Sequence, residues 1–330
     1  MRNLVTGGTG LLGQNLVRLL LARGQDVRVL ARDLAGARSL AGLPVEVVRG
    51  DVRDAAEVAA AVRGVDRVFH SAALVQIGRR NLAAFRSVNA LGAGCVAEAC
   101  RRAGVRMLHV SSVDVLGFGT RESPADEHRP PEHSEWVPYV ASKREGDSRV
   151  MREIEDGLDA VVVHPAYFLG PWDWRPSSGR LLLAIARGTM LAAPPGGNDF
   201  CHVEDVALGC LAAAESGAAG DRFILGGEAL TYREAFQLFA RVTGGRGPMV
   251  TLPAAAAQLA GFAGDALGTL LGREPDLNSG SVHMSCLPHH FSDRKAREAL
   301  GYRPRPAEAA AIDAWQWFQA HGYAPRPRRP

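Results

Sequence analysis

The sequence predicts an α/β protein in which a doubly wound parallel sheet is followed by a smaller, mostly helical portion. Two observations carry this prediction. Short, β-rich apolar runs alternate with longer helical patterns through the first half of the chain, and a glycine-rich loop directly follows the first of these runs. Apolar strands separated by helices of this length form right-handed crossovers, which build a parallel sheet with helices on both faces.

Six strands and four helices account for the first half of the chain. The predicted strands are Asn3–Thr6, Asp26–Arg32, Val45–Asp51, Asp66–Ala72, Arg106–Ser112 and Asp159–Ala166. The predicted helices are Leu11–Arg23, Asp54–Arg63, Phe85–Ala103 and Pro138–Asp156. In this arrangement the carboxyl ends of all the strands lie at one edge of the sheet, where α/β proteins bind ligands.

Composition and charge argue against several classes of protein. The chain has 330 residues, is 22% charged, and carries a formal net charge of +3 with its arginines spread along it, so we predict no nucleic-acid partner. Its five cysteines form no C-x-x-C pair and no zinc-ligand spacing, so we expect no metal site and a reduced cytoplasm. Without a signal peptide or a bilayer-spanning apolar stretch, the sequence predicts a soluble protein with no membrane insertion.

The first strand runs directly into a loop that opens a helix, Thr6-Gly7-Gly8-Thr9-Gly10-Leu11-Leu12-Gly13. Its glycines permit a tight turn, a close approach of backbone to a pyrophosphate, and close packing of helix on strand. The helix N-terminus adds free N–H groups for phosphates. This context predicts a Rossmann-type dinucleotide site rather than an ordinary turn, with these residues at the cofactor: Gly7, Thr9, Gly10, Leu11, Leu12 and Gly13.

The alternation of strands and helices ends near Ala166, where Gly- and Pro-rich loops begin to separate mostly helical segments. We therefore predict a dinucleotide-binding domain over residues 1–166 and a substrate-binding portion over residues 167–330, packed on the carboxyl edge of the sheet. Segments near residues 200–228 return to the first domain, because Arg222–Gly226 reads as a further strand. The Pro/Arg tail near residues 325–330 is predicted to be disordered.

Arg32 decides the predicted cofactor. An acidic residue at the end of the second strand accepts the ribose hydroxyls of NAD, whereas an arginine suits the extra phosphate of NADP. The sequence here is Ala31-Arg32-Asp33, so the arginine favours NADP. NAD remains an alternative because the acidic Asp33 is adjacent. An exposed surface arginine is the alternative for Arg32.

The next two strand ends supply further cofactor contacts. Asp51 and Val52 follow the third strand, where Asp51 could accept a hydrogen bond from the adenine amino group. The fourth strand ends in His70-Ser71-Ala72-Ala73, and small residues there let a cofactor lie close to the backbone. We expect His70 to be structural rather than an acid or base.

The stretch Pro138-Tyr139-Val140-Ala141-Ser142-Lys143 carries the predicted chemistry. Proline is favourable as the first residue of a helix, which then places Tyr139 and Lys143 one turn apart on the same face. An ordinary tyrosine has a pKa of about 10, and a nearby ammonium would lower it toward the range of a useful acid or base. The lysine could also hold the nicotinamide ribose.

A serine pair, Ser111-Ser112, ends the fifth strand. A hydroxyl there could donate to the substrate oxygen whose proton Tyr139 transfers, and we favour Ser112 over Ser111. Capping of the strand end is the alternative for either serine. For Asp114, assistance in proton transfer and a plain polar loop residue remain equally open.

These stretches resemble the extended short-chain dehydrogenase/reductase family, also called the NAD-dependent epimerase/dehydratase superfamily. The matching stretches, in order and over essentially the whole chain, are TGGTGLLG, GDV, HSAA, VNALGAG, SSVDVLG, YVASK, HPAYFLGP and FCHVEDVA. The stretches ILGGE, GREP and GYRPRP look like those of dihydroflavonol reductase-like proteins and hopanoid-associated sugar epimerase-like proteins. The resemblance implies the catalytic triad Ser112, Tyr139 and Lys143, further cofactor contacts at Asn89, Pro165 and Phe168, and a homodimer joined through two helices of each subunit.

Two positions depart from the nucleotide-sugar epimerases of this family. Those enzymes usually carry asparagine where this chain has Tyr167 and arginine where it has Asn198, and both family residues contact the diphosphate. Charge-assisted contacts are among the stronger ones, so this loss matters. Other arginines that could compensate are Arg175, Arg180 and Arg273. Aromatic residues of the pocket loops could hold a ring-bearing ligand or simply pack beneath the loops: Trp136, Tyr167, Phe168, Trp172 and Trp174.

Together these features predict an NADP(H)-dependent oxidoreductase that reduces a carbonyl or oxidises a secondary alcohol of a small-molecule substrate, with Tyr139 as acid/base. The alternative is a nucleotide-sugar epimerase that regenerates its NAD(P). A non-catalytic NADP sensor is a third hypothesis, which the intact Tyr/Lys pair disfavours.

Overall fold

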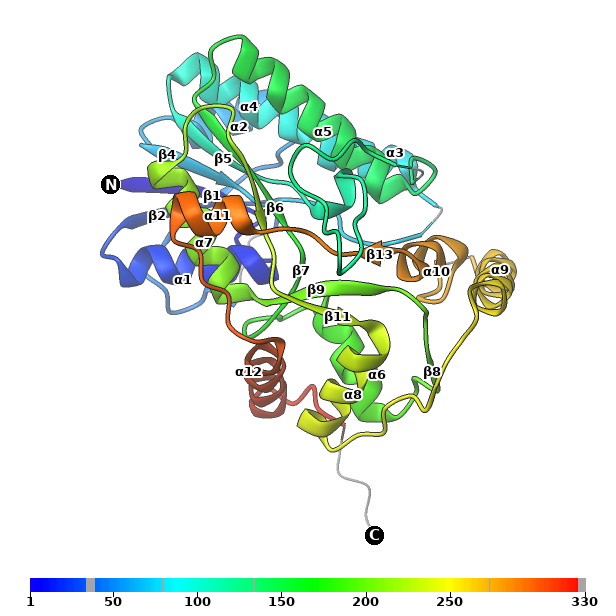
Figure 1. Ribbon diagram of the computed structural model, residues 1–330. Helices are drawn as coiled ribbons and strands as arrows, with labels where there is room; N and C mark the ends of the chain where they lie inside the picture. Colours follow the sequence, from blue (N-terminus) through cyan, green and yellow to red (C-terminus); the bar gives the residue numbers. More distant parts are fainter. Residues whose placement is uncertain (34–38, 79, 133, 273, 326–330) are drawn as a thin grey trace.

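A seven-stranded parallel sheet lies at the centre of the computed structural model, which describes residues 1–33, 39–78, 80–132, 134–272 and 274–325 (Figure 1). Its order is β10-β6-β5-β4-β1-β2-β3. The strands are β1 (Arg2–Thr6), β2 (Asp26–Ala31), β3 (Glu46–Arg49), β4 (Arg67–His70), β5 (Arg106–Val110), β6 (Ala160–Pro165) and β10 (Arg222–Leu225). The predicted doubly wound sheet is confirmed, and its order reverses between β1 and β4, the place where such folds bind ligands.

Successive residues of each strand point to opposite faces of the sheet, and both sets are largely apolar, so helices cover both faces. The helices α1 (Leu11–Ala22) and α7 (Val203–Ser216) pack together on one face, over a core that includes Val5 and Val29. On the other face lie α2 (Ala55–Val62), α4 (Gly92–Ala103) and α5 (Pro138–Glu155), over a core that includes Leu4 and Leu30 (Figure 1).

The predicted helix Phe85–Ala103 is not continuous. It consists of α3 (Leu82–Phe85), a π-helical turn η2 (Arg86–Leu91) and then α4. A π turn inserts a residue into the helix and is often found at functional sites. Here it carries Asn89 and packs closely on α5, where the Cβ of any residue other than glycine at Gly146 would overlap the carbonyl oxygen of Asn89.

The second half contains more strand than predicted. A four-stranded sheet joins β7 (Tyr167–Leu169), β9 (Gly197–His202), β11 (Glu228–Thr231) and β13 (Pro288–His289), and a small ribbon joins β8 (Ala192–Ala193) with β12 (Val250–Thr251). The helices are α6 (Gly179–Arg187), α8 (Tyr232–Thr243), α9 (Ala254–Leu270), α10 (Ser279–Cys286), α11 (Arg294–Leu300) and α12 (Ala307–Ala320). Helices still make up most of this half, as predicted, whereas the second sheet was not predicted.

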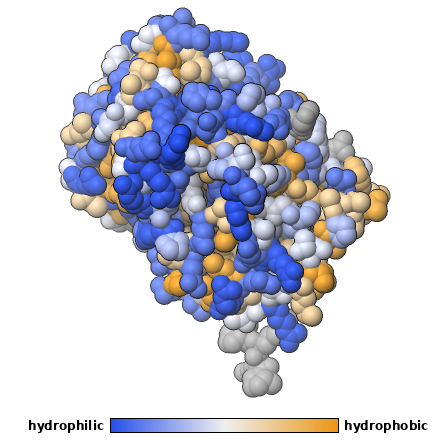
Figure 2. All heavy atoms as spheres, in the orientation of Figure 1, coloured by the Kyte–Doolittle hydropathy of each residue, from blue (hydrophilic) through white to orange (hydrophobic). Residues whose placement is uncertain are grey.

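The helix α9 has an unusually apolar outward side. It packs through its small residues on α10 and leaves Leu259, Phe262, Leu267 and Leu270 exposed, and Figure 2 shows apolar surface where α9 lies in Figure 1. Within the described part of the chain, no helix combines the length and apolar character needed to cross a bilayer.

Candidate active site

The glycine loop is shaped so that only glycine fits at its key positions. Gly7 has a φ of +73°, and a Cβ there would lie 2.6 Å from the backbone nitrogen of Ala72. A Cβ at Gly13 would overlap the carbonyl oxygen of Gly7, so helix α1 can start this close to β1 only without a side chain. The loop and the N-terminus of α1 form a cradle of the kind that binds a dinucleotide pyrophosphate.

The segment after β4 is fixed against this loop. Ser71 donates its hydroxyl to the Thr6 carbonyl (2.8 Å), and the Thr6 hydroxyl bonds Nδ1 of His70 (2.8 Å). Burial, together with the nearby His109 and Lys143, lowers the pKa of His70 well below its usual value. His70 is therefore neutral and holds the strand end in place, which is a structural role.

Asn89 ties the cofactor loop to helix α5. Its side-chain oxygen accepts from the Leu74 backbone nitrogen (2.8 Å), and its amide donates to the Leu74 carbonyl (3.1 Å) and to the Ser142 hydroxyl (3.0 Å). Asn89 thus fixes the stretch that contains Ser71, Ala72 and Ala73 relative to the helix that carries Tyr139.

The adenosine end of the predicted site is more open. Arg32 is exposed, and it lies near enough to Asp51 to favour the ionised carboxylate. Both Asp51 oxygens accept hydrogen bonds from Arg53, at 2.9 and 2.6 Å, and these bonds are the main cause of the lowered pKa of Asp51. The predicted adenine contact of Asp51 would therefore share that carboxylate with Arg53.

The predicted triad comes together at the carboxyl end of β5. Helix α5 begins with Pro138, and its first turns bury Tyr139 and Lys143 beneath the strand end. A hydrogen bond joins Tyr139 with Ser112, and Nζ of Lys143 donates to the Val110 carbonyl (2.8 Å). Pro165, at the end of the neighbouring strand β6, lies at the same edge of the sheet, and Phe168 follows it in β7.

The pKa of Tyr139 is shifted upward, opposite to the direction expected from Lys143. Burial is the main cause, and the negative charge of Asp114 adds to it, whereas the bond with Ser112 acts the other way. Burial likewise lowers the pKa of Lys143, against the opposing effect of Asp147 and Asp114. Tyr139 therefore holds its proton at neutral pH, which suits a proton donor.

Asp147 is a site residue that the sequence analysis missed. It lies one turn beyond Lys143 on α5 and accepts hydrogen bonds from Ser111 (2.7 Å) and from Nε2 of His109 (3.1 Å), while Nε2 of His164 lies 3.3 Å away. Burial alone would raise its pKa, but the bonds from the two histidines outweigh burial and hold the pKa far below its usual value. The Ser111 hydroxyl is thus committed to Asp147.

A second polar group borders the triad on its other side. The Ser112 hydroxyl donates to Oδ2 of Asp114 (2.9 Å), and Oδ1 of Asp114 lies 3.7 Å from Nε2 of the buried His289. No local pattern in the sequence points to His289, because β13 reaches the site through long-range pairing with Asn198 of β9 and with Gly119. Asn198 in turn bonds Tyr232.

The other residues predicted around the substrate are mostly structural. The Tyr167 hydroxyl donates to the Ser178 carbonyl (2.6 Å), and Arg180 pairs with Asp276 (3.1 Å). Trp172 and Trp174 pack against Trp317 under their loop, whereas Trp136 lies against His283 and is partly exposed. Arg273 and the tail residues 326–330 lie outside the described residues.

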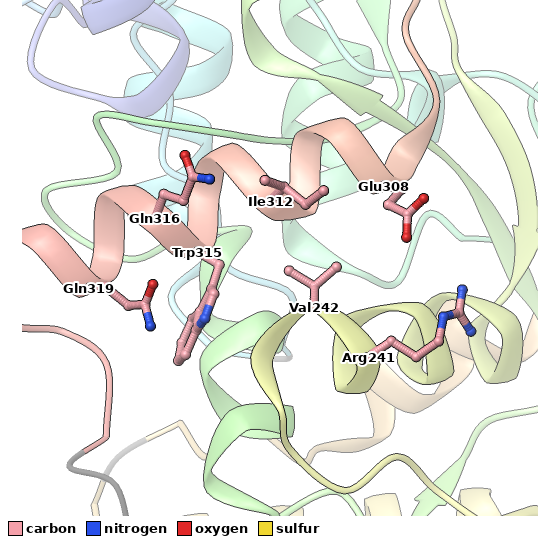
Figure 3. Close-up of a pocket in the computed structure, with 7 residues that line it drawn as sticks. All are labelled: Arg241, Val242, Glu308, Ile312, Trp315, Gln316 and Gln319. Carbon is pink, nitrogen blue, oxygen red and sulfur yellow. The ribbon is translucent and has the colours of Figure 1, made fainter.

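A surface hollow between α8 and α12 is separate from this site. Figure 3 shows it lined by Arg241, Val242, Glu308, Ile312, Trp315, Gln316 and Gln319. None of these residues belongs to the glycine loop or to the array around Tyr139. The candidate active site is instead the edge of the main sheet, where the glycine loop, the triad and Asp114 meet.

This fold and site define a Rossmann-fold, nicotinamide-dependent enzyme of the extended short-chain dehydrogenase/reductase type. Residues 3–226 match the model of the NAD dependent epimerase/dehydratase family, and the chain belongs to that family. The resemblance inferred from the sequence stretches is thereby confirmed.

Three curated relatives match nearly the whole chain. The "Sterol demethylase protein B" of Methylococcus capsulatus is 35% identical over 98% of this chain and 99% of its own length. The "Putative dihydroflavonol 4-reductase" of Synechocystis is 32% identical over 97% of this chain and 95% of its own length. A Stigmatella aurantiaca protein, "4-hydroxy-2-methyl-3-oxo-4-farnesyl-3,4-dihydroquinoline-1-oxide ketoreductase", is 31% identical over all of both chains.

Two solved structures share the fold along the full chain. The protein gox2253 has a TM-score of 0.85 at 34% identity and covers 98% of this chain and 99% of its own. The UDP-glucose 4-epimerase of Thermus thermophilus in complex with NAD has a TM-score of 0.76 at 25% identity, over 97% and 99%.

Proposed function

We propose that the protein is an NADP(H)-dependent reductase of ketones, which runs in the reverse direction as a dehydrogenase of secondary alcohols. The observation that carries this proposal is the buried array of Ser112, Tyr139 and Lys143 beside the glycine loop. A bound reduced nicotinamide supplies the hydride, and the protein must then supply one proton and orient one oxygen.

The side chains divide these tasks. Tyr139 keeps its proton at neutral pH and can pass it to the oxygen of a carbonyl undergoing reduction. Ser112, hydrogen-bonded to Tyr139, orients that oxygen. Lys143 lies on α5 one turn after Tyr139, and its ammonium group is held by a hydrogen bond to the Val110 carbonyl of β5. The cradle at Gly7 and Gly13 fits the pyrophosphate, and Arg32 is exposed at the surface, where it can meet a 2′-phosphate.

The names of two relatives support ketone reduction. The Synechocystis protein is named as a putative dihydroflavonol 4-reductase, and the Stigmatella protein as the ketoreductase of a 3-oxo compound. The alternative, epimerisation of a nucleotide sugar, is disfavoured because the Tyr167 hydroxyl is bonded to Ser178 and Asn198 is uncharged. A diphosphate buried without a cation is strongly penalised.

The experiment is to follow NADPH oxidation with a panel of aldehydes and ketones, with wild type and two tyrosine variants. Tyr139→Phe should abolish turnover and leave the affinity for NADPH within a few fold. Tyr323→Phe is the matched control, because the Tyr323 hydroxyl bonds the Trp174 carbonyl away from the site, and it should keep full activity. Full turnover in Tyr139→Phe would refute the mechanism. Interconversion of sugar nucleotides without net loss of NADPH would establish the epimerase instead.

A further inference from the structure

The exposed apolar side chains of the protein gather in one part of the chain. Of the sixteen large apolar side chains that are exposed in the described residues, eight lie between residues 249 and 277. Seven of these belong to residues 249–272, which we call the outer segment: Met249, Val250, Leu259, Phe262, Leu267, Leu270 and Leu271. Exposed apolar residues scattered singly are ordinary, whereas a group of them marks a surface that meets a partner.

Helix α9, which forms most of the outer segment, is packed in the opposite sense from an ordinary surface helix. Such a helix turns its large apolar residues toward the core. In α9 the buried stripe consists only of small residues, Ala257, Gly261, Gly264 and Gly268. A Cβ at Gly264 would overlap the Leu277 carbonyl oxygen, so the approach to α10 lies directly against this stripe. The large side chains point outward, with Leu259 and Leu270 exposed to 71% and 85%, at the rim of the molecule (Figure 1).

Charged groups border this surface but do not lie on it. The one charged residue of the outer segment is Asp265, whose carboxylate accepts from the backbone nitrogen that starts α10 (3.1 Å). Arginines reach the segment at its two ends. Arg80 donates to the Thr269 hydroxyl in the last turn of α9 (3.0 Å), and Arg233 donates to the Met249 carbonyl (3.4 Å). The surface is therefore apolar in its middle and positively charged at its ends.

Acidic residues that follow the outer segment do not cancel these arginines. Asp276 pairs with Arg180 (3.1 Å), and the Glu274 side chain lies against the backbone of Gly78. An apolar strip with cationic ends is complementary to a bilayer with anionic headgroups, where apolar side chains enter the headgroup region and arginines meet the phosphates.

The size of the surface disfavours a second copy of the chain as the partner. Helix α9 has 17 residues and is about 25 Å long, so its outward half presents roughly 400 Å². A standard protein interface buries about 800 Å² on each partner. A bilayer requires no such complementary area, because the apolar face of a helix sinks only about 5–10 Å into the headgroup region.

We propose that the outward side of α9, with Arg80 and Arg233 at its ends, docks the protein on the surface of a bilayer that contains anionic phospholipid. The helix lies on the membrane rather than across it, because its opposite side is packed on α10. The docking surface is independent of the reductase activity, and it stands or falls whether or not the active site reduces ketones.

Sedimentation of the full chain with lipid vesicles tests the docking. Wild type should bind vesicles of phosphatidylcholine and phosphatidylglycerol in equal parts. Leu259→Gln/Leu270→Gln should lower the partition coefficient at least tenfold, because glutamine keeps the helix and removes the apolar contact. Leu208→Gln/Ile312→Gln, two exposed apolar residues of α7 and α12, is the matched control and should bind as wild type does. Thermal unfolding of each protein checks that it is folded.

A second pair of variants tests the charged ends. Arg80→Gln/Arg233→Gln should bind the same vesicles several fold more weakly and with less dependence on salt. Absence of wild-type binding, or binding that survives in folded Leu259→Gln/Leu270→Gln, would overturn the docking. Self-association that this variant abolishes, without vesicle binding, would show that a second copy covers α9. Equal binding of wild type to pure phosphatidylcholine would overturn the role of the arginines. If the double leucine variant fails to fold, Phe262→Gln decides by the same partition coefficient.

Discussion

Asp147→Asn tests whether the buried carboxylate beneath Lys143 supports both the fold and the chemistry. The substitution keeps the volume of the side chain and removes its charge. The carboxylate now accepts from Ser111 and His109, and both bonds become neutral in the variant. A charge-assisted hydrogen bond contributes roughly 1 kcal/mol more than a neutral one, so the two weakened bonds and the lost attraction to His164 make a loss of about 2–3 kcal/mol.

This loss converts to a measurable shift in melting temperature. The entropy of unfolding is about 2.1 cal/mol/K per residue, or roughly 0.7 kcal/mol/K for this chain of 330 residues. A loss of about 3 kcal/mol therefore lowers the melting temperature by about 4 °C. The pKa of Asp147 is depressed in the folded protein, so its contribution is complete above the ordinary pKa of about 3.9 and fades as the pH falls below that.

The assays are thermal unfolding followed by circular dichroism and the pH profile of turnover. The gap between wild type and Asp147→Asn should be constant near neutral pH and shrink in acid. The charge of Asp147 also raises the pKa of Lys143, so the alkaline limb of the activity profile should move to lower pH in the variant. Asp156→Asn, at the exposed end of α5, is the control, with an expected change below about 0.5 kcal/mol. Unchanged melting and an unchanged pH profile in Asp147→Asn would refute this reasoning.

Three further predictions follow from the site and the thiols. Calorimetry should show that wild type binds NADPH about tenfold or more tightly than NADH, and that Arg32→Ala reduces this preference. The control Arg63→Ala, at an exposed position, should leave the preference unchanged. Equal affinities of wild type for the two cofactors would show that Arg32 is only a surface residue. Gly13→Ala should weaken binding of either dinucleotide by at least tenfold and lower the melting temperature, because its Cβ would overlap the Gly7 carbonyl; wild-type affinity would contradict the cradle. A thiol reagent should modify at most Cys95 and Cys286 in the native protein and all five cysteines after denaturation, because burial protects the other three; rapid reaction of a third native thiol would refute this.

The main sheet could be predicted because its signals are local. Each strand is a short apolar run flanked by a turn, and each crossover helix has its own period, so the order of elements follows from reading the chain once. The triad could be predicted for the same reason, since Tyr139 and Lys143 are one helical turn apart. What could not be predicted from spacing was the pKa direction of Tyr139, which depends on burial and on Asp114.

The missed features depend on long-range pairing. Asn198 and His289 are 91 residues apart in sequence and lie side by side because β13 pairs with β9. No local sequence pattern predicts this pairing. The strands of the second sheet are short and lack alternation, so they resemble loops. Asp147 did carry a local signal, its place one turn after Lys143, but a buried histidine pair was needed to give that position a meaning.

The return of the chain to β10 has a consequence for how the protein can be made. Because β10 pairs with β6 and α7 packs on α1, the part of the protein built around the seven-stranded sheet is incomplete until residue 225 has been synthesised. Its other strands have by then long been synthesised. A nascent chain that ends near residue 166 would present the bare edge of β6, Ala160–Pro165, and the uncovered apolar side of α1. Unpaired apolar strand edges pair with strands of other molecules. A fragment that ends near residue 166 should therefore aggregate rather than form a small dinucleotide-binding domain.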